Sequence, residues 1–412
     1  MNRRGVCGAD AMLGWATPVV RSALGIVALL SLGCGLLGAP GGGRPERGTL
    51  DLTRWALTRI DVDVVGEPVT LCPGQSVQLS IVAEAKHKDR DKVRLVQTYE
   101  GNRPGLGGRN KLGFESFALR SSQGRFDPHG WYAPSEDPFV SVDGFTLEVE
   151  HTPNPKLATT LNFKPAYDCV RQGGGGGASG APGRTGSTGA SGERGDYGGS
   201  SEDGGAGGAG GSGSNGGEGT AGAAGPRLSA WATVVRTPHH PHLVLLEYEG
   251  DMTGRAMFDS HTSFVLSAPG GPGGRGGAGG PGGSGGSGGG GAHGGGGGAG
   301  GPGGTGGMGG PGGAGGHIDL VVDDRFPELV QLIRLDVSGG GGGFGGAVGS
   351  GGRGGSGGHS SDEDTIDGPD GSEGADGTSG ANGRSGAPGL ANARVGAVDE
   401  RFSALPDRVV RL

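Results

Sequence analysis

Glycine recurs at every third position over four stretches of the chain, and this period limits the folds that those stretches can adopt. The four glycine tracts are residues 174–227, 270–317, 339–359 and 368–391. Three residues per turn is the period of the polyproline II helix, which makes no internal hydrogen bonds. Its backbone N–H and C=O groups therefore need partners from a neighbouring chain segment or from water. A face that carries only glycine lets another backbone come close enough to be that partner.

The number of glycines per triplet differs between the tracts. The constant feature of the first and fourth tracts is one leading glycine per triplet, whereas the second and third tracts have glycine at the second position as well. A bundle of extended helices explains this order, because an interior helix needs two faces that carry only glycine, whereas a helix at the border needs one. We therefore expect the tracts to pack side by side as polyglycine II helices. The alternatives are a flexible glycine-rich coil and a collagen triple helix, for which the tracts contain little proline.

Composition separates this glycine-rich part from a part that can form a core. The 412 residues include 104 glycines, and only 32% of the residues are hydrophobic and 5% aromatic. These values are too low for a uniform globular enzyme of this length. The net charge of -8 provides no basic field, so we expect no nucleic-acid partner.

Residues 49–172 have an ordinary composition and a hydrophobic period of two. Apolar residues alternate with polar ones in four segments: 59–65, 76–83, 145–150 and 157–163. This alternation is typical of half-buried strands, and several short strands in a region of this size predict a β-sandwich. Short apolar pieces between the glycine tracts predict further strands, and two of them flank a Pro-His-His-Pro turn as a hairpin. The predicted fold class is therefore mainly β.

The N-terminus and the cysteines predict an exported protein. Residues 1–34 place arginines before an apolar run that is too short to span a bilayer and fits a signal peptide, with Met12 as an alternative start. A Gly/Pro-rich tether, residues 35–48, follows. Only Cys72 and Cys169 remain in the mature chain, and we expect them to form a disulfide.

Three features resemble known families. The Ser-Leu-Gly sequence before Cys34 resembles a bacterial lipoprotein signal, which implies lipidation of Cys34 and a membrane anchor; ordinary secretion is the alternative. The segment VTLCPGQSVQLSIVA, residues 69–83, is similar to the opening strands of bacterial immunoglobulin-like domains. The triplets resemble those of glycine-rich, collagen-like exported proteins of bacteria.

Two groups of residues contain potential metal ligands. The first is a set of histidines in the predicted hairpin turn: His239, His240 and His242. The second lies in an acidic stretch: Asp362, Asp364 and Asp367. The histidines have no adjacent cysteine or carboxylate, and the acidic stretch lacks the spacing of an EF-hand loop. We therefore expect a solvated turn and a solvated loop, no metal and no cofactor.

Together these features predict a non-enzymatic structural or adhesive protein of the bacterial cell envelope. Residues 49–172 would form an immunoglobulin-like sandwich, and residues 173–412 would form the repeat region with interspersed strands. We expect a lipid-anchored monomer at the outer membrane or cell surface, with envelope components, extracellular proteins or glycans as partners; a trimer would require the collagen alternative. The alternative function is a glycan- or protein-binding module in 49–172, with the glycine tracts as flexible spacers.

Overall fold

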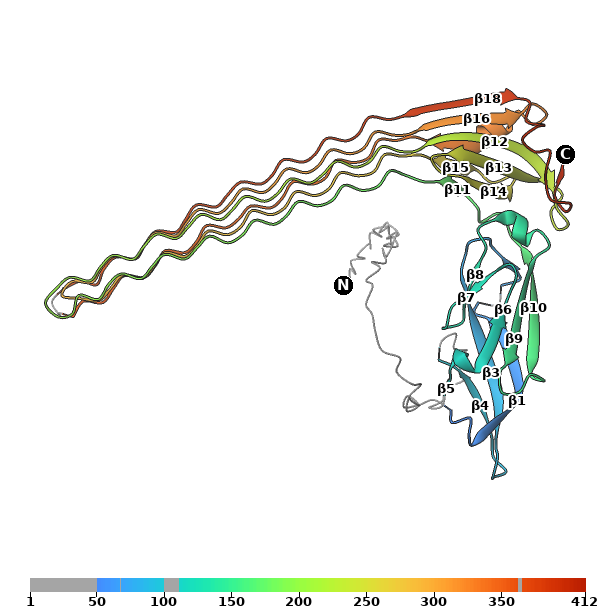
Figure 1. Ribbon diagram of the computed structural model, residues 1–412, viewed down its shortest axis with the longest axis horizontal. Helices are drawn as coiled ribbons and strands as arrows, with labels where there is room; N and C mark the ends of the chain where they lie inside the picture. The colour runs from blue at the N-terminus through green and yellow to red at the C-terminus, as the bar shows by residue number, and fades with distance from the viewer. Residues whose placement is uncertain (1–49, 67, 100–110, 362–364) are drawn as a thin grey trace, which may run out of the picture. The chain divides into compact units, whose positions relative to one another are not determined.

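The computed structural model describes residues 50–66, 68–99, 111–361 and 365–412 (Figure 1). The predicted signal peptide, the tether and Cys34 lie outside these residues. The described residues fold mainly as β-strands, which confirms the fold class at this level. Among them, no helix has the length and apolar character that a membrane crossing requires.

Two sheets form from residues before the first glycine tract. The strands of one sheet are β1 (Trp55–Val64), β3 (Val77–His87), β4 (Val93–Thr98), β5 (Lys111–Leu112), β7 (Gly124–Phe126) and β8 (Trp131–Pro134). The strands of the other are β2 (Thr70–Leu71), β6 (Phe117–Arg120), β9 (Phe145–His151) and β10 (Ala158–Pro165). Their orders are β5-β4-β3-β8-β7, with β1 beside β3, and β2-β10-β9-β6. Two short 3-10 helices, η1 (Phe114–Ser116) and η2 (Pro138–Ser141), lie between strands.

The alternating apolar residues of these strands meet in one hydrophobic core. In β9, Phe145, Leu147 and Val149 are buried, and they pack in the same cluster as Leu79 and Ile81 of β3. The four segments predicted from alternation overlap β1, β3, β9 and β10. The arrangement of two sheets on one core is consistent with the predicted β-sandwich.

A second pair of sheets forms from the pieces between the glycine tracts. One sheet is parallel and has the order β11 (Gln172–Gly174), β15 (Phe264–Ser267), β17 (Ile333–Asp336). The other has the order β14 (Gly254–Asp259), β13 (Leu243–Gly250), β12 (Arg227–Arg236), β16 (His317–Asp323), β18 (Leu390–Gly396), with β19 (Val410–Arg411) beside β12. The one α-helix in the described part of the chain, α1 (Leu329–Leu332), precedes β17. The antiparallel pairing of β12 with β13 confirms the predicted hairpin.

These two sheets enclose a core of their own. Phe258 of β14 stacks on Phe264 of β15, with ring centroids 4.5 Å apart, and both rings are fully buried. Leu228 of β12 and Ile318 of β16 belong to the same cluster. The pieces between the tracts are therefore stabilised by packing against one another, although each is too short to fold alone.

A buried carboxylate fixes the last strand to the larger sheet. Asp323, at the end of β16, is fully buried and accepts hydrogen bonds from Arg325 (3.0 Å), Arg411 (2.9 Å) and Thr233 (2.5 Å). Burial raises the pKa of Asp323, but the hydrogen bonds from Arg325, Thr233 and Arg411 outweigh burial and hold the pKa well below its usual value. The ionised carboxylate thereby links β12, β16 and β19.

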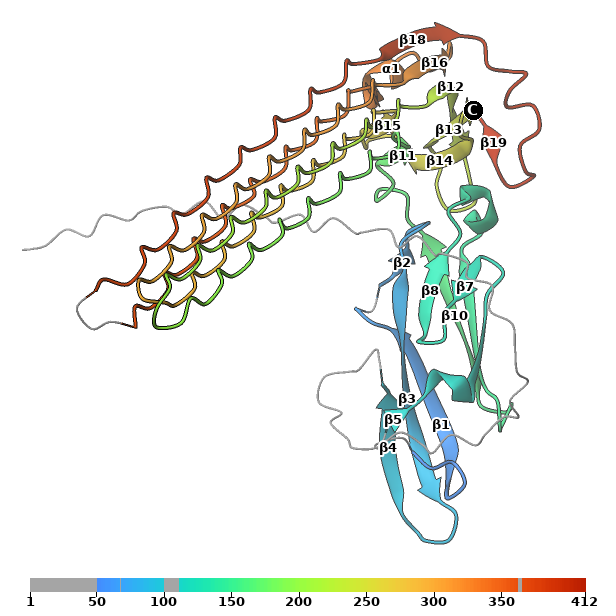
Figure 2. The ribbon, with the colours of Figure 1, turned by 60° about the vertical axis from the view of Figure 1, so that its left-hand side comes forward.

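The parallel strands lead directly into the glycine tracts (Figures 1 and 2). The first tract leaves β11, turns back and enters β12; the second leaves β15, turns back and enters β16; the third leaves β17, and the fourth enters β18. The expectation of one helix per tract is therefore wrong for the first two tracts, each of which is folded in half. The result is six extended segments, which we call A (175–198), B (204–225), C (270–289), D (294–316), E (339–358) and F (368–389).

Candidate functional site: the hydrogen-bonded glycine segments

The six segments form two layers, in each of which neighbouring segments are parallel. Segments A, C and E form one layer, and segments B, D and F form the other. A donates to C and C donates to E at every third residue; one example is Gly183 N–H to the Arg275 carbonyl oxygen (2.7 Å). B donates to D and D donates to F in the same way, as from Gly210 to Ala299 (2.8 Å). The layers continue the β11-β15-β17 sheet and the β12-β16-β18 strands, respectively.

A second set of backbone hydrogen bonds joins the layers. Each segment after A donates to the segment that precedes it in the chain, which runs in the opposite direction. Gly283 of C donates to the Gly211 carbonyl of B (2.8 Å), and Gly301 of D donates to the Gly283 carbonyl of C (2.8 Å). Segments C and D consequently bond to four neighbours each, B and E to three, and A and F to two.

These bonds give each triplet position a fixed role. The first-position N–H donates within the layer, the second-position N–H donates to the other layer, and the third-position carbonyl accepts within the layer. In C the first three positions are Gly270, Gly271 and Pro272. Third-position N–H groups are not used by these backbone bonds, so proline is tolerated there, as at Pro272 and Pro302.

Glycine occupies the positions where a side chain would enter a neighbouring backbone. A Cβ added at Gly282, a first position, would lie 1.9 Å from the Gly301 carbonyl oxygen. A Cβ added at Gly283, a second position, would lie 1.8 Å from the Ala190 carbonyl oxygen. Ser284, the third residue of this triplet, is exposed. First-position side chains thus point to the next segment of the chain, and second-position side chains point to the preceding segment of the layer.

The number of glycines follows the number of neighbours that a side chain would enter. C, D and E each have a following segment in the chain and a preceding segment in their layer, and both exclude side chains. These three segments carry two glycines in nearly every triplet. A has no preceding layer neighbour, so it needs glycine only at the first positions. F has no following segment, so it needs glycine only at the position that donates to segment E; by its hydrogen bonds this is the second position, although it leads each triplet in the sequence. B also has no preceding layer neighbour, and its second positions include Ser214, Thr220 and Ala223. The glycine content thus varies over six segments, whereas the sequence analysis considered it over four tracts.

Val348 is the exception to this pattern. It replaces a first-position glycine of segment E, and its side chain is exposed. The adjacent hydrogen bonds from Gly377 and Gly380 are 2.9 and 3.0 Å long, compared with 2.8 Å for the next bonds on either side. The hydrogen bonds between E and F thus continue past the valine.

Third-position residues supply the exposed side chains of the two layers. On the layer of A, C and E they include three arginines and two aromatic residues: Arg194, Arg275, Arg353, Tyr197 and Phe344. Tyr197 and Phe344 are 76% and 71% exposed. On the layer of B, D and F, third positions are mostly alanine, proline, serine and threonine, with Met308 exposed at 52%. The two layers therefore present surfaces of different charge and polarity.

Side chains of segment F cover the N–H groups along one edge. Segment E is the last of its layer, so its first-position N–H groups have no following segment. Three of them donate to side-chain oxygens of F: Gly345 to Asn382 (2.9 Å), Gly351 to Asp376 (2.7 Å) and Gly357 to Asp370 (2.8 Å). The sequence reasoning missed these capping residues, although their spacing of six residues, two triplets, is a signal for them.

The turns between segments hold two histidine–aspartate pairs. His293 Nδ1 lies 2.7 Å from Asp203 Oδ1, and His359 Nδ1 lies 3.0 Å from Asp367 Oδ2. Asp367 also accepts a hydrogen bond from the Ser360 N–H. This bond is the main cause of the lowered pKa of the Asp367 carboxyl, and His359 lowers the pKa further. Asp367 is thus a turn-stabilising residue in the structure. Asp362 and Asp364 lie outside the described residues.

The three histidines of the β12–β13 turn have separate environments. His239 Nε2 lies 3.1 Å from the Asp143 carbonyl oxygen, His240 packs edge-on against Tyr167, and His242 is exposed. Burial lowers the pKa of His240, and the neighbouring His239 adds to this shift. Across the described ranges, no three histidine, cysteine or acidic side chains form a group that could hold a metal ion.

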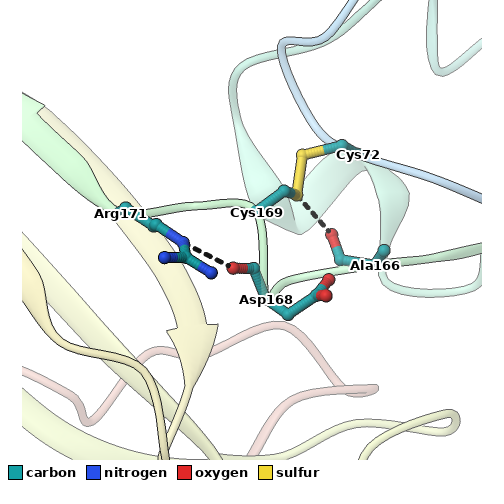
Figure 3. Close-up of a disulfide and its surroundings, with 5 residues drawn as sticks. All are labelled: Cys72, Ala166, Asp168, Cys169 and Arg171. Carbon is teal, nitrogen blue, oxygen red and sulfur yellow. Dashed lines mark hydrogen bonds between the residues drawn. A yellow bond between two sulfur atoms is a disulfide. The ribbon is translucent and has the colours of Figure 1, made fainter. Parts of the chain in front are cut away.

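Cys72 and Cys169 form a disulfide, as the sequence predicts (Figure 3). Cys72 follows β2, and Cys169 lies in the link from β10 to β11, close to the start of segment A. Beside the bridge, Arg171 Nε donates to the Asp168 carbonyl oxygen (3.2 Å). The bridge therefore fixes the chain where it leaves the first pair of sheets.

Neither a protein-family model nor a curated protein nor a solved structure matches this chain. The assignment of function consequently depends on the geometry described above.

Proposed function

We propose that segments A to F are polyglycine II helices packed as one bundle. The observation that carries this proposal is the hydrogen bonding at every third residue in two directions, together with glycine at the positions where a Cβ would enter a neighbouring backbone. At ~3.1 Å per residue, a segment of about 20 residues would extend for about 60 Å. Bonded on several sides, such helices would be stiff despite their glycine content.

The bundle suits a structural or adhesive role in the bacterial cell envelope. We propose that the protein is non-enzymatic, is exported and is held at the outer membrane or cell surface by a lipid on Cys34. A disulfide is typical of oxidising compartments outside the cytoplasm, which supports export. The regular rows of exposed third-position side chains would be the surface that meets envelope components, extracellular proteins or glycans. All six helices come from one chain, which favours a monomer.

Trypsin digestion tests the bundle directly. The segments contain five exposed arginines: Arg184, Arg194, Arg275, Arg353 and Arg384. Trypsin needs several residues in an open, unpaired conformation, so we expect these bonds to survive in the native protein and to be cut in urea. Peptide mapping by mass spectrometry would locate the cuts. Rapid native cleavage at these arginines, with residues 50–165 left intact, would reject the bundle and favour flexible spacers on a ligand-binding module.

Metabolic labelling tests the anchor. Expression of the full chain in a bacterium supplied with radiolabelled palmitate should label the protein, and Cys34→Ala should abolish the label and release the protein from the membrane fraction. Cys7→Ala is the matched control and should leave both unchanged. Export without label would favour ordinary secretion instead.

A further inference from the structure

The edge of the bundle formed by segments A and B is covered along only part of its length. Each second-position residue of B lies beside a second-position N–H of A, which has no preceding segment to bond. Thr220 Oγ1 accepts from the Ala181 N–H (2.7 Å), and Ser214 Oγ accepts from the Ser187 N–H (2.6 Å). Between them Gly217 has no side chain, and an added Cβ there would lie 2.9 Å from the Arg184 nitrogen, so hydroxyl side chains cover alternate donors in this half of the edge.

In the other half, toward the turn, the equivalent residues of B are glycines. A Cβ at Gly205, Gly208 or Gly211 would lie 2.8, 2.9 or 3.1 Å from the backbone nitrogen of Asp196, Glu193 or Ala190, respectively. Packing within the bundle does not require glycine here, because serine and threonine occupy the same position at 214 and 220. The three N–H groups are left uncovered and have no acceptor among the described residues.

A row of carbonyl groups lies next to these N–H groups. In D and F, third-position carbonyls accept hydrogen bonds from the preceding segment of the layer, as Ala299 does from Gly210. Segment B is first in its layer, so the equivalent carbonyls of Ala206, Ala209 and Ser212 receive no backbone bond from the described chain. Three donors and three acceptors, each repeating every third residue, thus face the place that a further segment would occupy.

We propose that this half-edge, residues 190–196 and 205–212, binds an extended Gly-Xaa-Yaa segment of another protein. The partner's glycine N–H groups would donate to the carbonyls of Ala206, Ala209 and Ser212, and its carbonyls would accept from the N–H groups of Ala190, Glu193 and Asp196. Its glycine would face segment A, as the first-position glycines of the bundle face the next segment. This inference rests on the proposed bundle, which it extends by one helix, in the way that a peptide strand extends an open sheet edge.

The chemistry of the partner follows from the positions at which its segment must carry glycine. Only one residue in three has to be glycine, and neither of the others uses its N–H, so proline is allowed at both. A proline-containing Gly-Xaa-Yaa segment would also arrive already extended, which reduces the entropy lost on binding. A second copy of this chain is a poor occupant, because its own six segments are already engaged and segment F carries acidic side chains at the position that must face A.

The probe is a dye-labelled peptide of four Gly-Ala-Pro repeats, titrated against the full-length protein and followed by fluorescence anisotropy. We expect saturable binding. The triple variant Gly205→Ser/Gly208→Ser/Gly211→Ser should weaken binding about tenfold or more, because three hydroxyls would cover the donors as Ser214 does. The double variant Ser214→Gly/Thr220→Gly should strengthen binding, because it extends the open half-edge. A peptide of the same composition in scrambled order should not bind.

Trypsin resistance of each variant keeps the two proposals separate. A trypsin-resistant wild-type protein that does not bind the peptide would overturn the binding site and leave the bundle standing. Equal binding by the wild type and the triple serine variant would also overturn it. Concentration-dependent self-association that the serine variant abolishes would identify a second copy as the occupant and reject the proposed partner. A trypsin-sensitive wild-type protein would reject the bundle and the inference with it.

Discussion

Replacing Gly283 and Gly301 with alanine is expected to unfold the glycine segments while the first pair of sheets remains folded. Both residues are second positions of interior segments, where an added Cβ would lie 1.8 Å from the Ala190 carbonyl oxygen and 2.0 Å from the Gly211 carbonyl oxygen, respectively. These contacts are with backbone, which cannot turn aside as a side chain can. We expect each substitution to lower the free energy of unfolding by about 3 kcal/mol. Urea denaturation and the rate of trypsin cleavage within the segments would measure the loss.

The matched control places the same methyl-sized side chain one residue later. Ser284→Ala with Pro302→Ala changes the third positions of the same two triplets, whose side chains are exposed. The free energy of unfolding should change by no more than about 0.5 kcal/mol per site. If the glycine and control variants were equally stable, the close backbone packing of the interior segments would be wrong.

Removal of the disulfide should produce the other large loss of stability. Cys72 and Cys169 are 97 residues apart, and in the chain-entropy model a closed loop of that length stabilises the folded state by about 4–5 kcal/mol. We expect the variant Cys72→Ser/Cys169→Ser to lose about this much, with the first pair of sheets affected most because both cysteines adjoin its strands. Urea denaturation of the wild-type and variant proteins is the measurement.

Reduction provides the control for the disulfide. Dithiothreitol should lower the stability of the wild-type protein to that of the double serine variant, and it should leave the variant unchanged. A wild-type protein whose denaturation midpoint does not respond to dithiothreitol would show that the bridge contributes nothing to folding.

Local sequence predicted the strands because burial on one face determines them. The alternation of Phe145, Leu147 and Val149 gives β9 its buried face, and the apolar residues on either side of the Pro-His-His-Pro turn give the β12–β13 hairpin. The cysteine pair was equally predictable, since only two of the four cysteines lie outside the predicted signal peptide. These features depend on residue type and on spacing within one segment, which the sequence displays directly.

The folding of the first two tracts was harder to predict, because the glycine period continues through each turn. Yet Ser201 is the only residue that replaces a leading glycine in the first tract, and Ala292 is the only one that replaces a second-position glycine in the second tract. Both lie in turns, at residues 199–203 and 290–293. In these two tracts the irregularities of the repeat therefore mark the turns, whereas Val348 of the third tract lies within segment E.

The capping residues depend on register between segments, which no single segment reveals. Asp370, Asp376 and Asn382 look like ordinary polar residues of a border tract until the partner N–H groups of segment E are placed beside them. The open half-edge at Gly205, Gly208 and Gly211 was missed for the same reason. In sequence these glycines resemble those that packing requires, and only the comparison with Ser214 and Thr220 separates the two kinds.

The shared register of the six segments also constrains how such a chain can change during evolution. An insertion of one or two residues in segment C would shift its glycines onto the wrong neighbours, and even a whole triplet would displace every bond beyond it unless segments A, B, D and E changed in step. The length of one segment therefore cannot change unless the lengths of its neighbours change with it. The number of segments is less constrained. Duplication of one pair of segments that leaves a strand and returns to another (an excursion), together with those strands, would add two segments without altering any existing contact except at the border. We therefore expect relatives of this protein to differ in the number of excursions more readily than in the length of each.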